Sequence, residues 1–74
     1  MARLPNLSPK KVITALKRAG FDFHHQHGSH AYFWHSQKEL MTSVPIHPGD
    51  VDRGLMKKII KQADLSEDEF RDLL

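Results

Sequence analysis

Apolar residues recur along the chain with two different periods, and the change of period separates helices from strands. The first apolar stripe has helical spacing and consists of Val12, Ile13, Ala15, Leu16 and Ala19. Ser8 followed by Pro9 is typical of an N-terminal cap with proline at the first helical position. Gly20 is typical of the residue that follows the C-terminal end of a helix. The pattern predicts a first helix from Pro9 to Ala19.

The next stretch has the alternation and composition of strands. Phe21 to His27 predicts one strand, and the aromatic-rich stretch from His30 to His35 predicts its return. Between them, Gly28-Ser29 predicts a two-residue hairpin turn with glycine where φ is positive. A third strand is expected from Leu40 to Val44, ended by Pro45.

The aromatic residues of these strands are candidates for the core. We expect Phe21, Phe23 and at least one of Tyr32, Phe33 and Trp34 to be buried. The return strand is aromatic at successive positions, so the alternation does not decide which of its faces is the core face.

The C-terminal third is helical again. After a Pro-Gly loop, Asp50 or Asp52 is expected to cap a second helix, whose apolar face consists of Leu55, Met56, Ile59, Ile60 and Ala63. Ser66 and Glu69 have the spacing of a capping box and open a short third helix, with Phe70, Leu73 and Leu74 apolar.

This order predicts an α+β fold: helix, three-stranded antiparallel sheet, helix, and a short C-terminal helix. Packing both helices on one face of the sheet buries both apolar stripes, which is the arrangement of a double-stranded-RNA-binding domain. With 74 residues, we expect residues 1–74 to form a single domain.

Composition and charge narrow the class of protein. The chain has no cysteine, which excludes disulfides and thiolate zinc sites. It has no long apolar stretch and no signal-peptide pattern, so we expect a cytoplasmic protein that does not enter the membrane. The net charge of +2 combines a basic body with acidic residues concentrated after position 63. A basic body favours a polyanionic partner.

The histidines around the predicted turn are the candidate catalytic residues. A two-residue turn places His27 opposite His30, with Cβ atoms roughly 4.5–5.5 Å apart. Imidazole, with an unperturbed pKa of about 6.5, suits general acid–base catalysis near neutral pH. Gly28 has no Cβ, so a ligand backbone can come close. From spacing alone, a solvated surface histidine remains the competing interpretation.

A metal site is the second interpretation of the histidines. The chain has six, at positions 24, 25, 27, 30, 35 and 47, but no HExxH motif and no cysteine partner. In a regular strand His24 and His25 point to opposite faces. We therefore expect neither a metal nor another cofactor.

Lysines on the two predicted long helices, and Lys38 in the polar turn after the second strand, support a phosphate-rich partner. The candidates for RNA phosphate contacts are Lys10, Lys38, Lys57, Lys58 and Lys61. Such contacts add affinity without reading sequence. A solvated helix face carries similar lysines, so this signal alone does not separate the two interpretations.

Four segments together carry a resemblance to a known family. They are residues 12–21 (VITALKRAGF), residues 26–30 (QHGSH), residues 44–47 (VPIH), and residues 59–66 (IIKQADLS) with Glu69-Phe70. In this order they resemble HicA toxins, the mRNA-cleaving partners of HicB antitoxins.

The resemblance implies a fold similar to a double-stranded-RNA-binding domain and a metal-independent ribonuclease that cleaves mRNA and stops translation. The family's catalytic histidine follows Gly-Ser, which implies His30 as the catalytic residue, with Gly28 and Ser29 supporting it. The family often has Lys or Arg at the place of His27, so its catalytic role does not carry over. A second proton-transfer group is open between His27, His47 and water. A HicB-like antitoxin is the implied protein partner.

Two positions depart from the family pattern. Asp64 stands where a glycine usually ends the second helix, and Gly54-Leu55 stands where Gly-Thr is frequent. Asp tolerates left-handed backbone less well than glycine, so we expect a loss of stability rather than of function.

The alternative function is a non-catalytic RNA-binding module of double-stranded-RNA-binding-domain type, which needs the lysines but no particular histidine.

Overall fold

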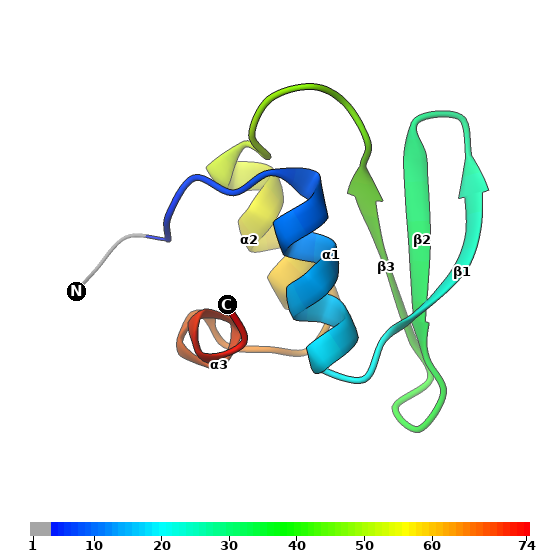
Figure 1. The fold of residues 1–74 in the computed structure, drawn as a ribbon. Helices are drawn as coiled ribbons and strands as arrows, with labels where there is room; N and C mark the ends of the chain where they lie inside the picture. Colours follow the sequence, from blue (N-terminus) through cyan, green and yellow to red (C-terminus); the bar gives the residue numbers. More distant parts are fainter. Residues whose placement is uncertain (1–3) are drawn as a thin grey trace.

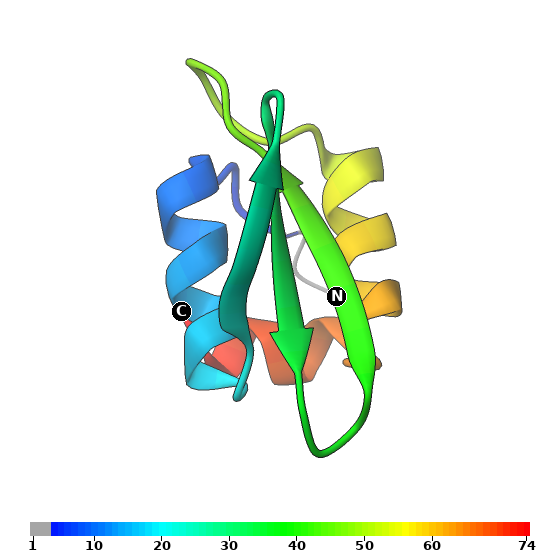
Figure 2. The same cartoon turned by 90° about the vertical axis from the view of Figure 1, so that its right-hand side faces the viewer.

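A computed structural model describes residues 4–74 of the chain as helices packed on one side of a small sheet (Figure 1). The elements in order are α1 (Pro9–Arg18), β1 (Asp22–His27), β2 (His30–His35), β3 (Leu40–Pro45), α2 (Arg53–Gln62) and α3 (Glu67–Asp72). The sheet is antiparallel with the order β1-β2-β3. Figure 2 shows it in front of α1 and α2, with its other face open. This confirms the predicted α+β arrangement.

Both long helices begin at capped residues. The Lys11 N–H donates to the Ser8 hydroxyl over 3.4 Å at the start of α1, and Pro9 occupies the first turn. At α2 the cap is Asp52, whose carboxylate accepts from the Leu55 N–H at 3.3 Å. Of the two predicted candidates, Asp52 rather than Asp50 therefore caps the helix.

The two long helices also end in the same hydrogen-bond pattern. After α1, the N–H groups of Gly20 and Phe21 donate to the carbonyls of Lys17 and Leu16, each over 3.0 Å. After α2, Asp64 and Leu65 donate to Lys61 and Ile60, each over 3.1 Å. These are Schellman motifs, which need a left-handed residue after the cap. Gly20 has φ 102° and Asp64 has φ 58°, which confirms that aspartate fills the glycine role at α2.

The sheet register assigns the aromatic residues of β2 to its two faces. Ala31 and Phe33 are buried against the helices, whereas Tyr32 and Trp34 are half-buried on the open face. On β3, Val44 and Thr42 are the buried partners of Ala31 and Phe33. The helices add Val12, Leu16, Met56, Ile59 and Ile60 to the same core.

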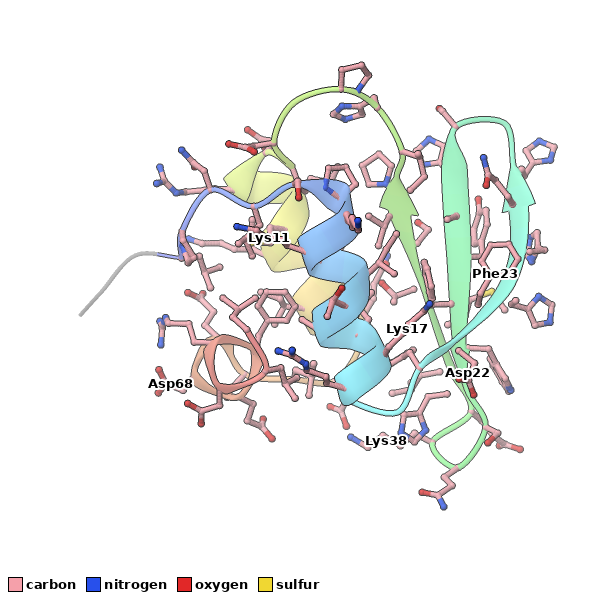
Figure 3. The ribbon with its side chains drawn as sticks, in the orientation of Figure 1. Lys11, Lys17, Asp22, Phe23, Lys38 and Asp68 are labelled. Carbon is pink, nitrogen blue, oxygen red and sulfur yellow. The ribbon has the colours of Figure 1, made fainter. Side chains whose placement is uncertain are left out.

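The prediction of a buried Phe23 is wrong. Phe21 is buried, but it lies just before β1, which begins at Asp22. Phe23 is 54% exposed and meets Phe33 edge-on, with ring centroids 5.9 Å apart. It lies on the edge strand, beyond the part of the sheet that the helices cover (Figure 3).

The expectation that His24 and His25 point to opposite faces is also wrong. The β1–β2 register shifts between Phe23 and His25, so the strand does not alternate regularly there. The two imidazoles instead lie against each other, with Nδ1 atoms 2.7 Å apart and ring centroids 4.9 Å apart.

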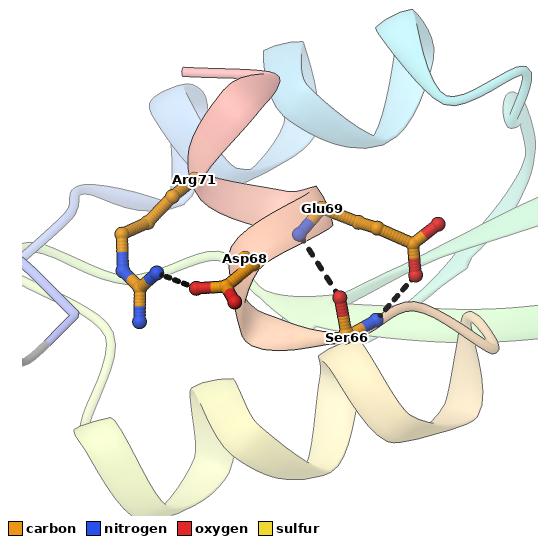
Figure 4. Close-up of polar contacts among 4 residues, drawn as sticks. All are labelled: Ser66, Asp68, Glu69 and Arg71. Carbon is orange, nitrogen blue, oxygen red and sulfur yellow. Dashed lines mark hydrogen bonds and ion pairs between the residues drawn. The ribbon is translucent and has the colours of Figure 1, made fainter. Parts of the chain in front are cut away.

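The acidic C-terminal helix α3 begins with the predicted capping box (Figure 4). The Glu69 N–H donates to the Ser66 hydroxyl over 3.0 Å, and the Ser66 N–H donates back to the Glu69 carboxylate over 2.9 Å. Phe70 anchors the helix in the core and is fully buried. Truncating such a side chain to alanine typically costs about 3–5 kcal/mol. α3 lies at the end of the molecule opposite the β1–β2 turn (Figures 1 and 2).

Candidate active site at the hairpin turn

The β1–β2 turn presents two histidines side by side. Gly28 and Ser29 form a two-residue connection, and the Cα partners on either side of it are His27 and His30. Gly28 has φ 60°, and Ser29 is not among the residues with positive φ, which is the pattern of a type II′ turn. The predicted hairpin and its His27–His30 pairing are confirmed.

Glycine at position 28 is required by the backbone rather than by packing. A Cβ built there meets no atom within 4 Å. Space is therefore open directly beside the turn, where His27, Ser29 and His30 are all exposed. Because Ala31 points into the core, alternation places His30 on the open face of the sheet.

A hydrogen bond joins this turn to the segment that carries His47. The Ile46 N–H donates to the Ser29 carbonyl over 2.6 Å, and Pro45 is the Cα partner of His30 on β3. Two segments that lie about fifteen residues apart in the sequence, Gly-Ser-His and Val-Pro-Ile-His, therefore meet at one end of the sheet. Spacing along the chain does not predict this bond.

The ring of His47 is oriented by its own loop. Its Nδ1 lies 3.0 Å from the Pro48 carbonyl oxygen. A carbonyl only accepts, so Nδ1 is the donor in this contact and Nε2 remains for another partner. His47 is exposed, so Nε2 is available to a ligand.

A hollow beside His47 collects two lysines of α1. It has a volume of about 500 Å³ and is lined by Ser8, Pro9, Lys10, Ile13, Thr14, Lys17, Ile46, His47 and Gly49. Lys17 extends toward the sheet side of α1, whereas Lys11 points away from the sheet (Figure 3). Of the five lysines proposed for phosphate contacts, Lys10 thus lines a hollow together with His47. Lys17, a lysine outside that set, lines the same hollow.

The other four lysines lie elsewhere. Lys38 follows β2 and lies at the end of the sheet opposite the turn (Figure 3). Lys57 and Lys61 line a separate hollow between α2 and the acidic start of α3. Lys58 is exposed on α2. These residues do not converge on the turn.

His35 is buried and packed against core residues. It is 8% exposed, and its ring meets the edge of Phe21 with centroids 5.2 Å apart. The Lys38 N–H donates to Nδ1 over 3.1 Å, so Nδ1 accepts. A Cβ on Gly20 would lie 2.7 Å from Nε2, which adds a packing reason for glycine there. His35 therefore belongs to the core rather than to a site.

Within residues 4–74, no group of three or more histidine or acidic side chains is placed to hold a metal ion. The part of the chain that the structure describes also contains no helix long and apolar enough to cross a membrane. A mechanism without metal or other cofactor stays a prediction, supported so far by the residue types at the turn.

Comparison with known families decides the class of protein. The family model described as the HicA toxin of bacterial toxin–antitoxin systems matches residues 9–65. The chain belongs to the HicA toxin family. It is therefore the toxin component of a toxin–antitoxin system, and an antitoxin is its partner. The match covers α1, the whole sheet and α2, together with the turn that carries His30. No individual curated protein matches this HicA toxin.

Proposed function

We propose that this HicA toxin is a metal-independent endoribonuclease that cleaves mRNA and thereby inhibits translation, with His30 as its catalytic residue. The observation that carries the proposal is the position of His30. It directly follows the Gly28-Ser29 turn, as the resemblance to the family implies for a catalytic histidine, and it is exposed beside open space. It also has a second imidazole directly across the hairpin.

The proposed reaction needs two proton transfers. A base removes the proton of a ribose 2′-OH, and the 2′-oxygen attacks the adjacent phosphorus. The bond to the 5′-oxygen breaks, and an acid protonates that oxygen. The products are a 2′,3′-cyclic phosphate and a 5′-hydroxyl. His30 performs one of these transfers, and such catalysis contributes typically 10²–10⁴-fold in rate, as an order of magnitude.

The second transfer falls to His27 or His47, or to water. His27 is the Cα partner of His30, and its place on the adjacent strand brings its ring to the same phosphate. His47 enters from the loop held by the Ile46–Ser29 hydrogen bond and offers Nε2. Negative charge on the phosphorane is stabilised by donors aimed at it. In this proposal Lys10 supplies positive charge from the neighbouring hollow, and the backbone of Gly28 and Ser29 supplies turn N–H groups.

The remaining lysines have a secondary role in this proposal. Lys38, Lys57, Lys58 and Lys61 lie too far from the turn to act on the scissile phosphate, and they contact phosphates elsewhere along a longer mRNA. The partner is a HicB-like antitoxin that covers the turn in the cytoplasm. Its attraction to the basic body of the toxin weakens as salt concentration rises.

The proposal is tested on two matched RNA oligonucleotides that differ only by a 2′-deoxy substitution at the cleaved nucleotide. We expect the all-ribose RNA to be cut equally with and without EDTA, and the deoxy RNA to remain intact. Cleavage of the deoxy RNA contradicts the 2′-OH mechanism, and loss of activity in EDTA contradicts metal independence. Binding without any cleavage identifies a non-catalytic RNA-binding module instead.

A further inference from the structure

The open face of the sheet carries aromatic rings that the core does not use. Tyr32 and Trp34 alternate with the buried Ala31 and Phe33 on β2, so they lie half-buried on the face opposite the helices. That face of the sheet is the one turned toward the viewer in Figure 2. The core cluster, which contains Phe21, Phe33 and Phe70, includes neither of them. Neighbouring aromatic side chains on an open surface are candidates for a binding site.

These rings continue the line of the candidate active site. Positions 30, 32 and 34 share one face of β2, each about 6.6 Å from the next. Tyr32 is paired on β3 with Ser43, which has a small side chain. Trp34 is paired with Met41, which is 38% exposed.

A planar ring already stacks on this face. His25 of β1 lies parallel to Tyr32, with centroids 4.5 Å apart and planes inclined by 2°. On the open face, the imidazole of His25 therefore lies along the edge strand β1, and the rings of Tyr32 and Trp34 lie along the central strand β2. The described part of the face has one carboxylate beside Trp34, that of its partner Asp22.

We propose that the stacking face, defined as His25, Tyr32 and Trp34, binds the bases of single-stranded RNA next to the phosphate held at His30. The inference rests on the proposed function for the position of that phosphate. Bases stack on aromatic side chains whatever their identity, so the face holds unpaired nucleotides without strict sequence preference. An RNA duplex hides its base faces and does not fit this mode of binding.

RNA fits this surface better than a protein partner. The rings lie at successive outward positions of one strand that begins at the proposed catalytic histidine, as one chain of nucleotides requires. The imidazoles of His25, His27 and His30 border the rings and offer N–H donors to phosphate oxygens. An apolar protein surface has no acceptor groups to pair with these imidazoles.

Trp34 is the chain's single tryptophan and reports on stacking directly. The experiment titrates His30→Ala protein, in which cleavage is disabled, with an oligouridine and with an abasic oligonucleotide of equal length and charge. We expect the oligouridine to quench Trp34 fluorescence and to bind at least about fivefold more tightly, since stacking contributes roughly 1–3 kcal/mol per base. Equal affinity for the two ligands overturns the inference.

Two substitutions at Trp34 separate ring stacking from apolar contact. In the His30→Ala background, Trp34→Phe keeps an aromatic ring and Trp34→Leu removes it. Measured by the anisotropy of labelled oligouridine, we expect Trp34→Leu to weaken binding at least about fivefold and Trp34→Phe to bind within about twofold of its parent. Circular dichroism verifies that both fold. Equal binding by all three proteins overturns the stacking face.

Failure of this inference is distinguishable from failure of the proposed function. Cleavage by the wild-type protein is measured separately on the same RNA. Base-dependent binding without cleavage overturns only the ribonuclease proposal. Cleavage with base-independent binding overturns only the stacking face.

Discussion

His27 and His30 are direct partners across a two-residue turn, so the two imidazoles share one end of the sheet. The turn is held from the other side by the Ile46–Ser29 hydrogen bond. The candidate site therefore combines a hairpin turn with a neighbouring loop. Its chemistry depends on which of these imidazoles transfer protons and which only attract phosphate.

Substitutions at His27 separate those two roles. If His27 transfers a proton, His27→Ala and His27→Lys both slow kcat, by about 10²-fold. Because the family resemblance implies that a basic residue such as Lys or Arg serves at this place, we expect the second role instead. His27→Lys then retains kcat and KM, whereas His27→Ala raises KM. Steady-state kinetics on a short RNA distinguishes the two, and a large fall in kcat for His27→Lys contradicts our expectation.

The Ile46–Ser29 bond is predicted to matter more for activity than for stability. Ile46→Pro removes the donor, and Ile46→Val retains it. Losing one backbone hydrogen bond costs about 1 kcal/mol in the free energy of unfolding. A misplaced catalytic group, however, lowers activity by up to about 10²-fold. We expect kcat/KM to fall at least tenfold in Ile46→Pro, as an order of magnitude, and to stay unchanged in Ile46→Val.

If kcat/KM fell by the same small factor in both Ile46 variants, the Ile46–Ser29 bond would not position the turn. Denaturant unfolding of the two proteins is the control. It identifies any fall in activity that merely follows a fall in the folded fraction.

Gly20 and Asp64 occupy the same position in two identical helix ends, which gives opposite predictions for substitution. Asp64→Gly relieves left-handed strain and is expected to raise the free energy of unfolding by about 0.5–1 kcal/mol. Gly20→Ala adds strain at φ 102° and a Cβ 2.7 Å from His35 Nε2. We expect it to lower stability by about 2 kcal/mol or more. Urea unfolding measures both, and a destabilised Asp64→Gly contradicts the account.

The elements of the fold follow from local patterns, and for that reason most were predictable. Ser8, Ser66 and Gly28 act through hydrogen bonds or dihedral angles within a few residues, so their sequence signals are sufficient. Phe23 was mispredicted because its exposure depends on β1 being the edge strand beyond the helices. The contact between His24 and His25 depends on an irregular register, which regular alternation does not indicate.

The candidate site was predictable only in part. The His27–His30 pairing follows from the length of the turn. The approach of His47 depends on a bond between the turn and a distant loop. Whether Tyr32 and Trp34 lie on the open face depends on which side of the sheet the helices cover. Both are tertiary relationships that no local spacing expresses.

The capping box predicts a pH-dependent contribution to the stability of α3. The Ser66 backbone N–H, and then its hydroxyl group, lower the pKa of the Glu69 carboxyl from its usual 4.5 by favouring the ionised form. The stabilisation is therefore complete above that usual value and is lost as the pH falls through the lowered one. Glu69→Gln keeps the box geometry without the titration.

Urea unfolding between about pH 6 and about pH 3 tests this contribution. We expect wild type to lose more stability than Glu69→Gln across that range. Equal losses in the two proteins would show that the Glu69 carboxylate is not coupled to folding.

The most direct test of the central claim is mRNA integrity after induced expression of wild type, His30→Ala and His24→Ala. The last variant is a matched control, because it removes an exposed imidazole from the irregular part of β1, away from the turn. With folding verified by circular dichroism, we predict degraded mRNA and arrested growth for wild type and His24→Ala. For His30→Ala we predict intact mRNA and normal growth. A folded His30→Ala protein that still degrades mRNA would contradict the assignment of His30 as the catalytic residue.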